Sequence, residues 1–405
     1  MATNRRALTI AYDYFSCKGG AGRIARAIDA AMCNDGWYVD VLACDQAASV
    51  PTDSRRRIFR YHTSNCYSAS LPIGQHMAMA MSVLSCAKVL QSENDYSLVV
   101  AHHFLASLAF VDFKLTDRLK TVFVCHGIRK NHFACYAHEA AKSVTDPHEA
   151  WCYGTEAAMT EAMHALETEA ICSASKVSCV SNSVAAEVSS LWPSVVPEVI
   201  PNFYCLDHNG PCDEALDSGF GLAQWRFVIL FVGRWERTKG CDIVAEIARR
   251  MAQPRRYLFL HAGAIIDPPV SRYVRHVGHV DDAELVRLYQ SSTLLLMPSR
   301  YEPFGLTAIE AMWHGTPVLA HRVGGLAQIV EEGVNGGLMD TLDPSRWCER
   351  IQTLLERESN VRPNRDEIRA LAVRRFTGDR SIGKYLRMFR ELAEQSPGKL
   401  VPANS

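Results

Sequence analysis

Residues 299–315 have the sequence SRYEPFGLTAIEAMWHG, and the rest of the chain is organised around them. The apolar run just before them, at residues 293–298, predicts a buried strand. Apolar side chains from Leu306 to Met312 recur at helical spacing and predict a helix, with Gly305 at the turn that leads into it. The stretch therefore predicts a strand, a tight turn and a helix N-terminus, in that order.

Two glutamates, Glu302 and Glu310, flank this turn with seven residues between them. The N–H groups at a helix N-terminus have no partner within the helix, and they favour an anion. A ligand with a phosphate in its middle would therefore meet one carboxylate at each end. The alternative is a capped helix with two solvated glutamates, because short motifs recur by chance.

A basic loop lies upstream, where the sequence VGRWERTKG ends the apolar strand predicted at residues 227–232. Arg234 and Lys239 place two positive charges five residues apart at the end of that strand. A guanidinium offers a planar fork and an ammonium offers a point charge, and both suit a diphosphate. A solvated basic loop is the alternative, but the two glutamates in the same half of the chain favour phosphate binding.

Downstream, residues 315–340 have the sequence GTPVLAHRVGGLAQIVEEGVNGGLMD. Taken in order, these motifs resemble the retaining glycosyltransferases of family 4, which have the GT-B fold. The resemblance implies an α/β protein of two Rossmann-like domains with a cleft between them and a C-terminal helix that crosses back to the N-terminal domain. The boundaries expected from it are an acceptor-side domain at 1–205, a linker at 206–226, a nucleotide-sugar-binding domain at 227–376, the crossing helix at 377–395 and a tail at 396–405.

The composition agrees with two globular domains. The chain has 405 residues, of which 48% are hydrophobic and 21% charged, and a net charge of −1 gives no indication of nucleic acid as a partner. Fourteen cysteines lack any C-x-x-C pair, and the first apolar run is interrupted at Asp13. These features predict reduced thiols in a cytoplasmic protein.

A basic cluster in the N-terminal half leaves peripheral membrane contact open. The cluster consists of Arg55, Arg56, Arg57 and Arg60. One interpretation is a solvated loop, which is the usual setting of such charges. The other is contact with anionic lipid at the inner face of the membrane, which would suit a lipid-linked acceptor.

The N-terminal half also predicts a parallel sheet, because apolar strands alternate with helices, and ligands collect at the carboxyl ends of such strands. Gly19 and Gly20 follow the first strand, where the backbone can approach a phosphate or sugar closely; a tight turn is the alternative. His102, His103 and His126 fall at strand ends, where each has an ordinary structural role as its alternative. The family resemblance implies His126 near the donor sugar, with His102 or His103 on the acceptor side.

The resemblance implies the transfer of a hexose from a UDP- or GDP-linked donor to a hydroxyl acceptor, such as a saccharide, a glycolipid or a secondary metabolite. Cations and amides aimed at the leaving diphosphate would lower the barrier. Glu310 would accept hydrogen bonds from the ribose, Glu302 would hold donor-sugar hydroxyls, and His126 would bond the sugar from the opposite domain. The groups expected on the diphosphate are Gly19, Gly20, Arg234, Lys239 and the amides of Gly305, Leu306 and Thr307.

No metal or cofactor is expected. Asp281-Asp282 predicts a helix cap rather than a metal loop. The triplet His132, Cys135 and His138 has suggestive spacing but no obvious fourth ligand, so ordinary packing is favoured. The alternatives to a transferase are a GT-B enzyme of another type, such as a sugar-nucleotide epimerase, and a non-catalytic GT-B homologue.

Two further stretches, at residues 201–204 and 324–325, are compared with the family pattern. Family members usually continue Pro201-Asn202 with glycine and a small apolar residue, whereas this chain has Phe203-Tyr204, so the connection between the domains is expected to differ. The resemblance also implies that the pair Gly324-Gly325 lies beside the nucleotide. A plain tight turn is the alternative for these glycines.

Overall fold

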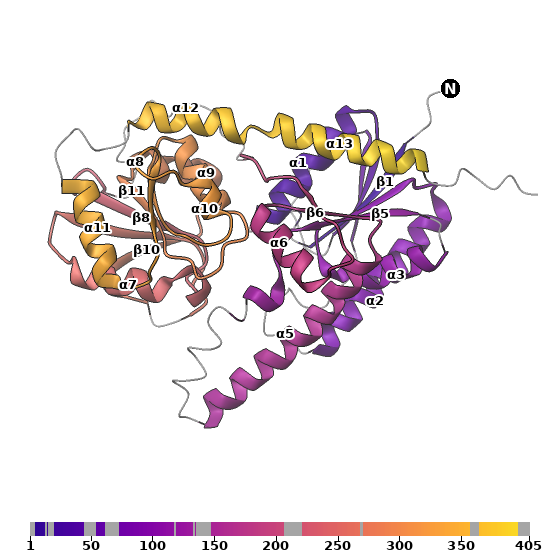
Figure 1. Cartoon of the computed structure of the whole chain (residues 1–405), viewed down its shortest axis with the longest axis horizontal. Coiled ribbons are helices and arrows are strands. Elements are labelled where there is room, and N and C mark those ends of the chain that lie inside the picture. The colour runs from indigo at the N-terminus through magenta and orange to yellow at the C-terminus, as the bar shows by residue number, and fades with distance from the viewer. Residues whose placement is uncertain are drawn as a thin grey trace, which may run out of the picture. The chain divides into compact units, whose positions relative to one another are not determined.

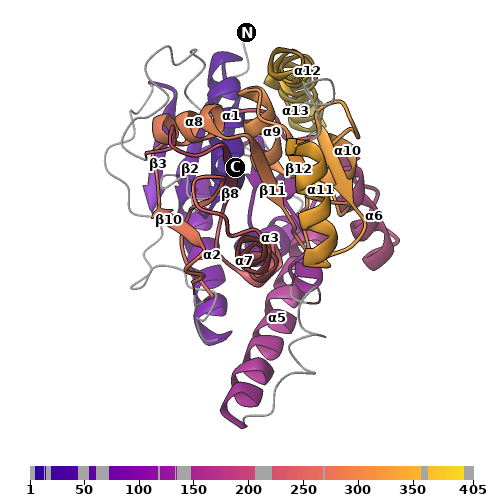
Figure 2. The ribbon, with the colours of Figure 1, turned by 90° about the vertical axis from the view of Figure 1, so that its left-hand side faces the viewer.

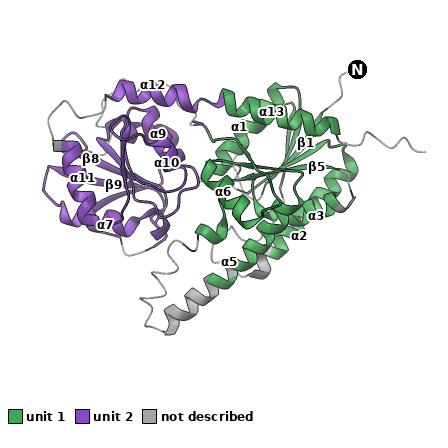
Figure 3. Cartoon of the chain, in the orientation of Figure 1, with its two compact units in different colours: residues 1–202, 379–405 green, residues 203–378 purple. Residues whose placement is uncertain are grey.

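The computed structural model describes residues 5–12, 14, 20–43, 54–60, 73–116, 119–132, 134, 147–205, 221–267, 270–356 and 364–395. The chain divides into two compact units, shown in separate colours in Figure 3. Unit 1 comprises Met1–Asn202 and Asp379–Ser405, and unit 2 comprises Phe203–Gly378. Most of the linker expected at 206–226 and all of the tail expected at 396–405 lie outside the described residues.

Unit 1 is built on a seven-stranded sheet in the order β3-β2-β1-β4-β5-β6-β7. Every pairing in it is parallel, and the central strands are buried apolar runs, as the alternation of strands and helices predicted. The strands are β1 (Arg6–Ala11), β2 (Tyr38–Ala43), β3 (Arg56–Arg60), β4 (Leu98–Ala101), β5 (Lys120–Cys125), β6 (Lys176–Cys179) and β7 (Glu198–Val199).

Helices pack on this sheet, and α2, α3 and α5 lie side by side (Figures 1 and 2). The C-terminal helix α13 packs in the same unit, where the Arg390 guanidinium binds the Asp35 carboxylate and Lys384 Nζ donates to the Val199 carbonyl at 3.3 Å. The helices are α1 (Gly20–Asn34), α2 (Ile73–Glu93), η1 (Phe104–Ala106), α3 (Ser107–Thr116), α5 (Pro147–Ser173), α6 (Asn182–Leu191) and α13 (Gly378–Gln395).

Unit 2 is built on a six-stranded parallel sheet in the order β10-β9-β8-β11-β12-β13. Helices α7 and α11 contact each other, as do α8, α9 and α12. The strands are β8 (Phe227–Val232), β9 (Tyr257–Ala262), β10 (Val274–Gly278), β11 (Leu294–Met297), β12 (Val318–His321) and β13 (Gly336–Met339). The helices are η2 (Arg237–Lys239), α7 (Cys241–Arg250), α8 (Asp282–Ser291), α9 (Leu306–Trp313), α10 (Leu326–Ile329), α11 (Pro344–Glu356) and α12 (Arg365–Phe376).

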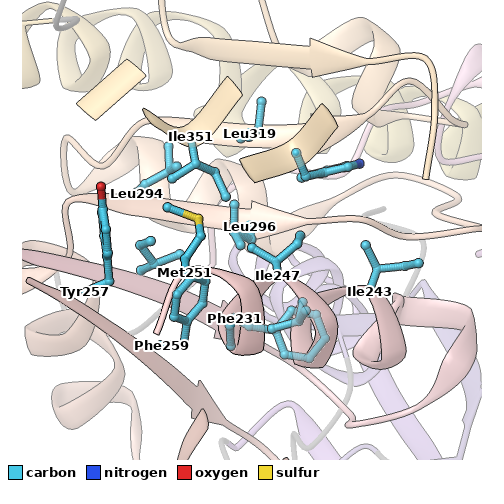
Figure 4. Close-up of a cluster of buried hydrophobic side chains, with 14 of the residues drawn as sticks. Phe231, Ile243, Ile247, Met251, Tyr257, Phe259, Leu294, Leu296, Leu319 and Ile351 are labelled. Carbon is cyan, nitrogen blue, oxygen red and sulfur yellow. The ribbon is translucent and has the colours of Figure 1, made fainter. Parts of the chain in front are cut away.

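A buried apolar cluster fixes α7 and α11 to the sheet of unit 2. Figure 4 shows side chains of β8, β9, β11 and β12, such as Phe231, Phe259 and Leu296, meeting those of α7 and α11, such as Ile247 and Ile351. All five are at most 3% exposed. Burying a side chain of this size stabilises a fold by about 1.5–3 kcal/mol, so this face of the sheet is held firmly.

Each sheet has one place where the strand order reverses direction. In unit 1 the reversal lies between β1 and β4, and in unit 2 it lies between β8 and β11. Neighbouring loops leave such a point in opposite directions, so a crevice opens at the carboxyl ends of the two strands, and ligands of open α/β sheets bind there. In unit 2 the loops at this point are residues 233–240 and residues 298–305, the two stretches that the sequence singled out.

The C-terminal end of the chain forms two helices, α12 and α13, and α13 covers almost the same residues as the helix expected at 377–395. Helix α12 begins after Asn364, whose side chain accepts from the Asp366 amide, and Thr377 separates it from α13. The strand β13 was not expected, because its first residues are glycines. A Cβ at Gly336 would lie 1.9 Å from the Val318 carbonyl oxygen, so close packing on β12 accounts for that glycine.

Much of the basic cluster lies in a strand and not in a loop, because Arg56 and Arg57 belong to β3, although Arg55 and Arg57 remain exposed. Arg57 makes a fork to the buried Asp40 at 2.6 and 2.7 Å, and Arg55 Nη1 donates to the Cys33 carbonyl at 3.0 Å. The guanidinium of Arg56 lies 3.5 Å from the Tyr14 hydroxyl. These three charges are therefore engaged within unit 1. Among the described residues, no helix combines the length and apolar character that crossing a bilayer requires.

A buried carboxylate ties α1 to the end of β1. Asp29 of α1 is fully buried, and the Thr9 hydroxyl donates to its Oδ1 at 2.7 Å. Burial raises the pKa of Asp29 to about 6, although hydrogen bonds from Thr9 and Tyr14 oppose the shift. The folded state therefore binds this proton more tightly than the unfolded chain does. The resulting stabilisation is complete below the ordinary pKa of 3.8 and is lost as the pH rises through 6.

Asp29→Asn should remove this pH dependence, because the amide oxygen still accepts from Thr9 but carries no charge. Relative to wild type, the variant should gain stability between pH 4 and pH 7.5, by about 2–3 kcal/mol at most. Thermal unfolding midpoints at several pH values within that range measure the difference. A difference between variant and wild type that stays constant with pH would contradict the assignment.

Candidate functional site

The loop after β8 presents Arg234 at the carboxyl edge of the unit 2 sheet. Its side chain is 55% exposed, and its Nη2 donates to Glu236 Oε1 at 2.8 Å. The same glutamate oxygen accepts from the Thr238 hydroxyl at 2.6 Å. Glu236 thus orients the guanidinium without burying it, and the exposed fork remains able to meet an anion.

Lys239 and Glu302, which the sequence placed in separate motifs, form an ion pair. Lys239 Nζ lies 2.8 Å from Glu302 Oε2, and their side chains are 25% and 10% exposed. The Ser299 hydroxyl lies 3.5 Å from the same oxygen. Each charge is compensated by the other, so both can be held in a partly buried place in the absence of a ligand.

A glycine lets the two loops approach this closely. Gly240, directly after Lys239, has φ 79°, and a Cβ there would lie 2.2 Å from the Pro298 carbonyl oxygen. Any other residue would strain the backbone and clash with the strand end that leads to Glu302. The glycine that closes the VGRWERTKG motif is therefore required by packing between the loops.

Helix α9 starts where the sequence predicted, with Gly305 as its N-cap at φ 108°. Glycine offers no capping side chain, so the N-cap residue itself makes no side-chain hydrogen bond to the first turn of this helix. The amides of Leu306 and Thr307 belong to the first turn of α9, where the helix dipole is positive. This N-terminus lies three residues after Glu302, at the same edge of the sheet as Lys239.

Glu310 lies on the second turn of α9 and is only 7% exposed. The hydroxyl of Tyr289, on α8, donates to its Oε2 at 2.9 Å. A solvated glutamate, the alternative that the sequence left open, is therefore wrong for this position. Tyr289 was not singled out from the sequence, because a tyrosine on the buried face of a helix gives no signal beyond core packing.

The glycine pair after β12 is more than a tight turn. A Cβ at Gly324 would lie 1.9 Å from the Glu302 carbonyl oxygen, and one at Gly325 would lie 2.1 Å from that of Phe304. The Gly325 amide donates to the Glu302 carbonyl at 2.9 Å. The pair therefore supports the backbone of the loop that carries Glu302. That it also lies beside a nucleotide stays a prediction.

The unusual Phe203-Tyr204 pair follows the chain crossing between the units, and both residues are buried in unit 2. The Tyr204 ring stacks on Trp313, with centroids 4.1 Å apart, and its hydroxyl lies 3.0 Å from His314 Nε2. Burial lowers the pKa of His314 to about 4, so the ring is neutral at pH 7. The crossing is thus anchored to the C-terminal end of α9, the helix that carries Glu310.

In unit 1, His126 follows β5 and pairs with His102, which follows β4. His102 Nδ1 lies 3.1 Å from His126 Nε2, and burial lowers the pKa of His126 to about 4. His102 Nε2 is buried without a hydrogen-bond partner among the described residues. A proton on that atom would be an orphaned donor, so the better arrangement has His102 donating through Nδ1. A neutral His126 then carries its own proton on Nδ1.

Four other residues were singled out from the sequence: His103, Gly19, Gly20 and Asp281. His103 caps η1, where its ring accepts from the Leu105 amide at 3.3 Å. Gly20 is the first residue of α1, and Gly19 lies outside the described residues. Asp281 caps α8 in a complete capping box with Glu284, as expected.

In the described part of the chain, no three His, Cys, Asp or Glu side chains are grouped to hold a metal ion. This search does not include the whole of the triplet His132, Cys135 and His138, for which ordinary packing was favoured. His132 lies in a short helical turn, whereas Cys135 and His138 are outside the described residues.

Two family models match this chain. The model of the family described as "Glycosyltransferase Family 4" matches residues 18–208, and that described as "Glycosyl transferases group 1" matches residues 226–357. The two matches cover most of both units. The chain belongs to the family 4 glycosyltransferases.

Two similar curated proteins are D-inositol 3-phosphate glycosyltransferases. The one from Corynebacterium urealyticum is 32% identical over 199 residues, which are 44% of this chain and 47% of the relative. The one from Catenulispora acidiphila is 27% identical over 340 residues, which are 77% of this chain and 76% of the relative. The first alignment thus spans about half of the relative's length.

Two solved structures show the same fold. Sucrose-phosphate synthase from Thermosynechococcus elongatus has a TM-score of 0.80 and 20% identity, with 97% of this chain and all of that one covered. Anabaena Alr3699/HepE in complex with UDP-glucose has a TM-score of 0.67 and 19% identity, with 96% and 99% covered. The expected GT-B architecture of two Rossmann-like domains is confirmed.

Gly325→Ala should displace the loop that carries Glu302, because the new methyl group meets the Phe304 backbone. We expect a loss of stability of about 1–3 kcal/mol, in the range of overpacking substitutions. The matched control is Gly383→Ala in α13, where the added Cβ meets nothing within 4 Å. That helical substitution should be neutral or stabilising by about 0.5–1 kcal/mol. Equal thermal unfolding midpoints for the two variants would contradict the close approach.

Proposed function

We propose that this chain is a retaining hexosyltransferase that moves a sugar from a UDP- or GDP-linked donor to a hydroxyl acceptor. One observation carries the proposal. Lys239 Nζ and Glu302 Oε2 lie 2.8 Å apart at the place where the strand order of the unit 2 sheet reverses. Glu302 lies three residues before Gly305, the N-cap of α9. A positive charge, a carboxylate and helix amides at one sheet edge are the groups that a sugar diphosphate needs.

The diphosphate is the leaving group in this reaction, so negative charge builds on it as the bond to the anomeric carbon breaks. The exposed Arg234 fork, Lys239 and the first-turn amides Leu306 and Thr307 stabilise that charge. Removing one such preorganised donor costs about 2.7–4 kcal/mol in comparable sites. This set of positive groups supplies the neutralisation for which other transferases use a divalent cation.

The Lys239–Glu302 pair also suits the sugar end of the donor. Glu302 accepts a hydrogen bond from Lys239 through Oε2, and its carboxylate can still accept hydrogen bonds from sugar hydroxyls. The same negative charge stabilises the positive charge that develops at the anomeric carbon. Glu310, held by Tyr289, accepts from the ribose hydroxyls in the manner of acidic residues in other nucleotide folds. His126 is assigned to the donor sugar on the family resemblance.

The donor and acceptor classes draw further support from the relatives. Anabaena Alr3699/HepE is described in complex with UDP and glucose and with UDP-glucose. Its sequence is 19% identical to this chain, a level of similarity that shows a shared fold only. The two curated relatives are named for D-inositol 3-phosphate. A cyclic polyol or saccharide hydroxyl is therefore our first acceptor class, ahead of a glycolipid or a secondary metabolite.

The test is a panel of sugar nucleotides with release of free nucleoside diphosphate as the readout. Wild type should turn over at least one UDP- or GDP-linked sugar. Arg234→Met combined with Lys239→Met should lower that turnover by at least about 10²–10³-fold, because two diphosphate contacts are lost. The matched control is Arg249→Met, which removes an exposed cation on α7 that pairs with Glu246. Full activity in the double variant would overturn the proposal, and an inactive wild type would favour a non-catalytic homologue.

A further inference from the structure

Arg300, which has no assigned part in the reaction, lies in the loop at residues 298–305 and hydrogen-bonds to the loop at residues 233–240. It follows Ser299 in the loop that carries Glu302. Its Nη1 and Nη2 reach the Asp242 carboxylate, each at 2.8 Å, in a planar fork. Asp242 is the second residue of α7, two residues beyond Gly240. The guanidinium therefore bridges from one loop to the helix that the other loop leads into.

Arg300 also binds the backbone of the loop that carries Lys239. Its Nη1 donates to the Arg237 carbonyl at 2.8 Å. Its own amide donates to the Thr238 carbonyl, also at 2.8 Å. These two carbonyls belong to the short turn η2, whose last residue is Lys239. Arg300 thus fixes the turn directly before the lysine that pairs with Glu302.

The side chain of Arg300 is buried, with 7% of it exposed, whereas that of Asp242 is 35% exposed. A buried guanidinium is held in one geometry when its fork is satisfied, and it is costly when its partner is removed. An arginine placed to contact a ligand would instead present its fork to solvent, as Arg234 does with 55% exposure. The position of Arg300 therefore indicates support of the loops and not contact with the donor.

We propose that Arg300 and Asp242 form a positioning pair that sets the spacing of Lys239 and Glu302 for the donor's diphosphate. The inference rests on the proposed function. Loss of the Arg300–Asp242 pair should affect mainly the β-phosphate, because the pair fixes the loop that carries Lys239, the residue proposed to bind that phosphate. Loss of the pair should weaken binding of a nucleoside diphosphate more than binding of the corresponding monophosphate.

Opposite charge changes separate positioning from simple electrostatics. Arg300→Met removes a positive charge and Asp242→Asn removes a negative one. If only the local field mattered, the first variant would bind diphosphate more weakly and the second more tightly. Positioning predicts that both bind it more weakly, because either change breaks the fork. Arg300→Lys keeps the charge but cannot form a fork and also reach the Arg237 carbonyl, so it should not restore the wild-type value.

The experiment is calorimetric titration of the full chain with UDP, UMP, GDP and GMP, for wild type and the three variants. For the base that wild type prefers, we expect the ratio of monophosphate to diphosphate dissociation constants to fall by about tenfold in Arg300→Met and Asp242→Asn, and kcat/KM to fall by about 10–100-fold. Arg249→Met has the same charge change as Arg300→Met and should keep the wild-type ratio. The double variant Arg300→Met/Asp242→Asn should be no worse than either single one.

The outcomes distinguish this inference from the proposed function. A wild type that binds diphosphate no more tightly than monophosphate overturns both. A wild type with the expected preference, together with an unchanged ratio in Asp242→Asn, overturns the positioning pair alone. Tighter diphosphate binding in Asp242→Asn overturns it as well, in favour of electrostatics. Asp242→Asn keeps the test decisive if Arg300→Met does not fold, because Asp242 is partly exposed and its removal leaves the shape of α7 intact.

Discussion

The ion pair between Lys239 and Glu302 depends on two loops that meet at the carboxyl edge of one sheet. Each residue is partly buried, and each charge would be costly there alone. The pairing requires backbones to pass closer than side chains allow, and glycines at 240, 324 and 325 provide that space. Arg300 then binds one loop to the other. Under the proposed function, these contacts would hold the diphosphate-binding groups in place before the donor arrives, which is the preorganisation that electrostatic catalysis requires.

Local patterns predicted much of unit 2, because its strands are continuous apolar runs and its functional loops carry recognisable motifs. The motifs named Lys239 and Glu302 but gave no sign that they pair. Strand order decides that contact, since the sheet places β11 beside β8 although two strands, β9 and β10, and the helices α7 and α8 lie between them in sequence. Tyr289 and Arg300 escaped notice for a related reason. Their roles are defined by partners that lie 21 and 58 residues away in the chain.

Charge patterns in unit 1 were harder to interpret than apolar ones. The arginine cluster suggested a solvated surface, yet the register of the sheet sets Arg57 directly opposite Asp40 on the neighbouring strand. The parallel pairing thereby gives one arginine of the apparent basic patch, Arg57, a cross-strand salt bridge. Likewise, His102 and His126 were expected at strand ends, but only the adjacency of β4 and β5 brings their rings within hydrogen-bond distance. Burial then keeps both rings neutral.

The most direct test of the account is a crystal structure of the chain with the nucleoside diphosphate that it binds best. The account predicts the β-phosphate within hydrogen-bond distance of Lys239 Nζ and of the Leu306 or Thr307 amide, with the ribose hydroxyls on Glu310. A diphosphate bound away from the N-terminus of α9, with Lys239 and Arg234 making no contact to it, would contradict the central claim.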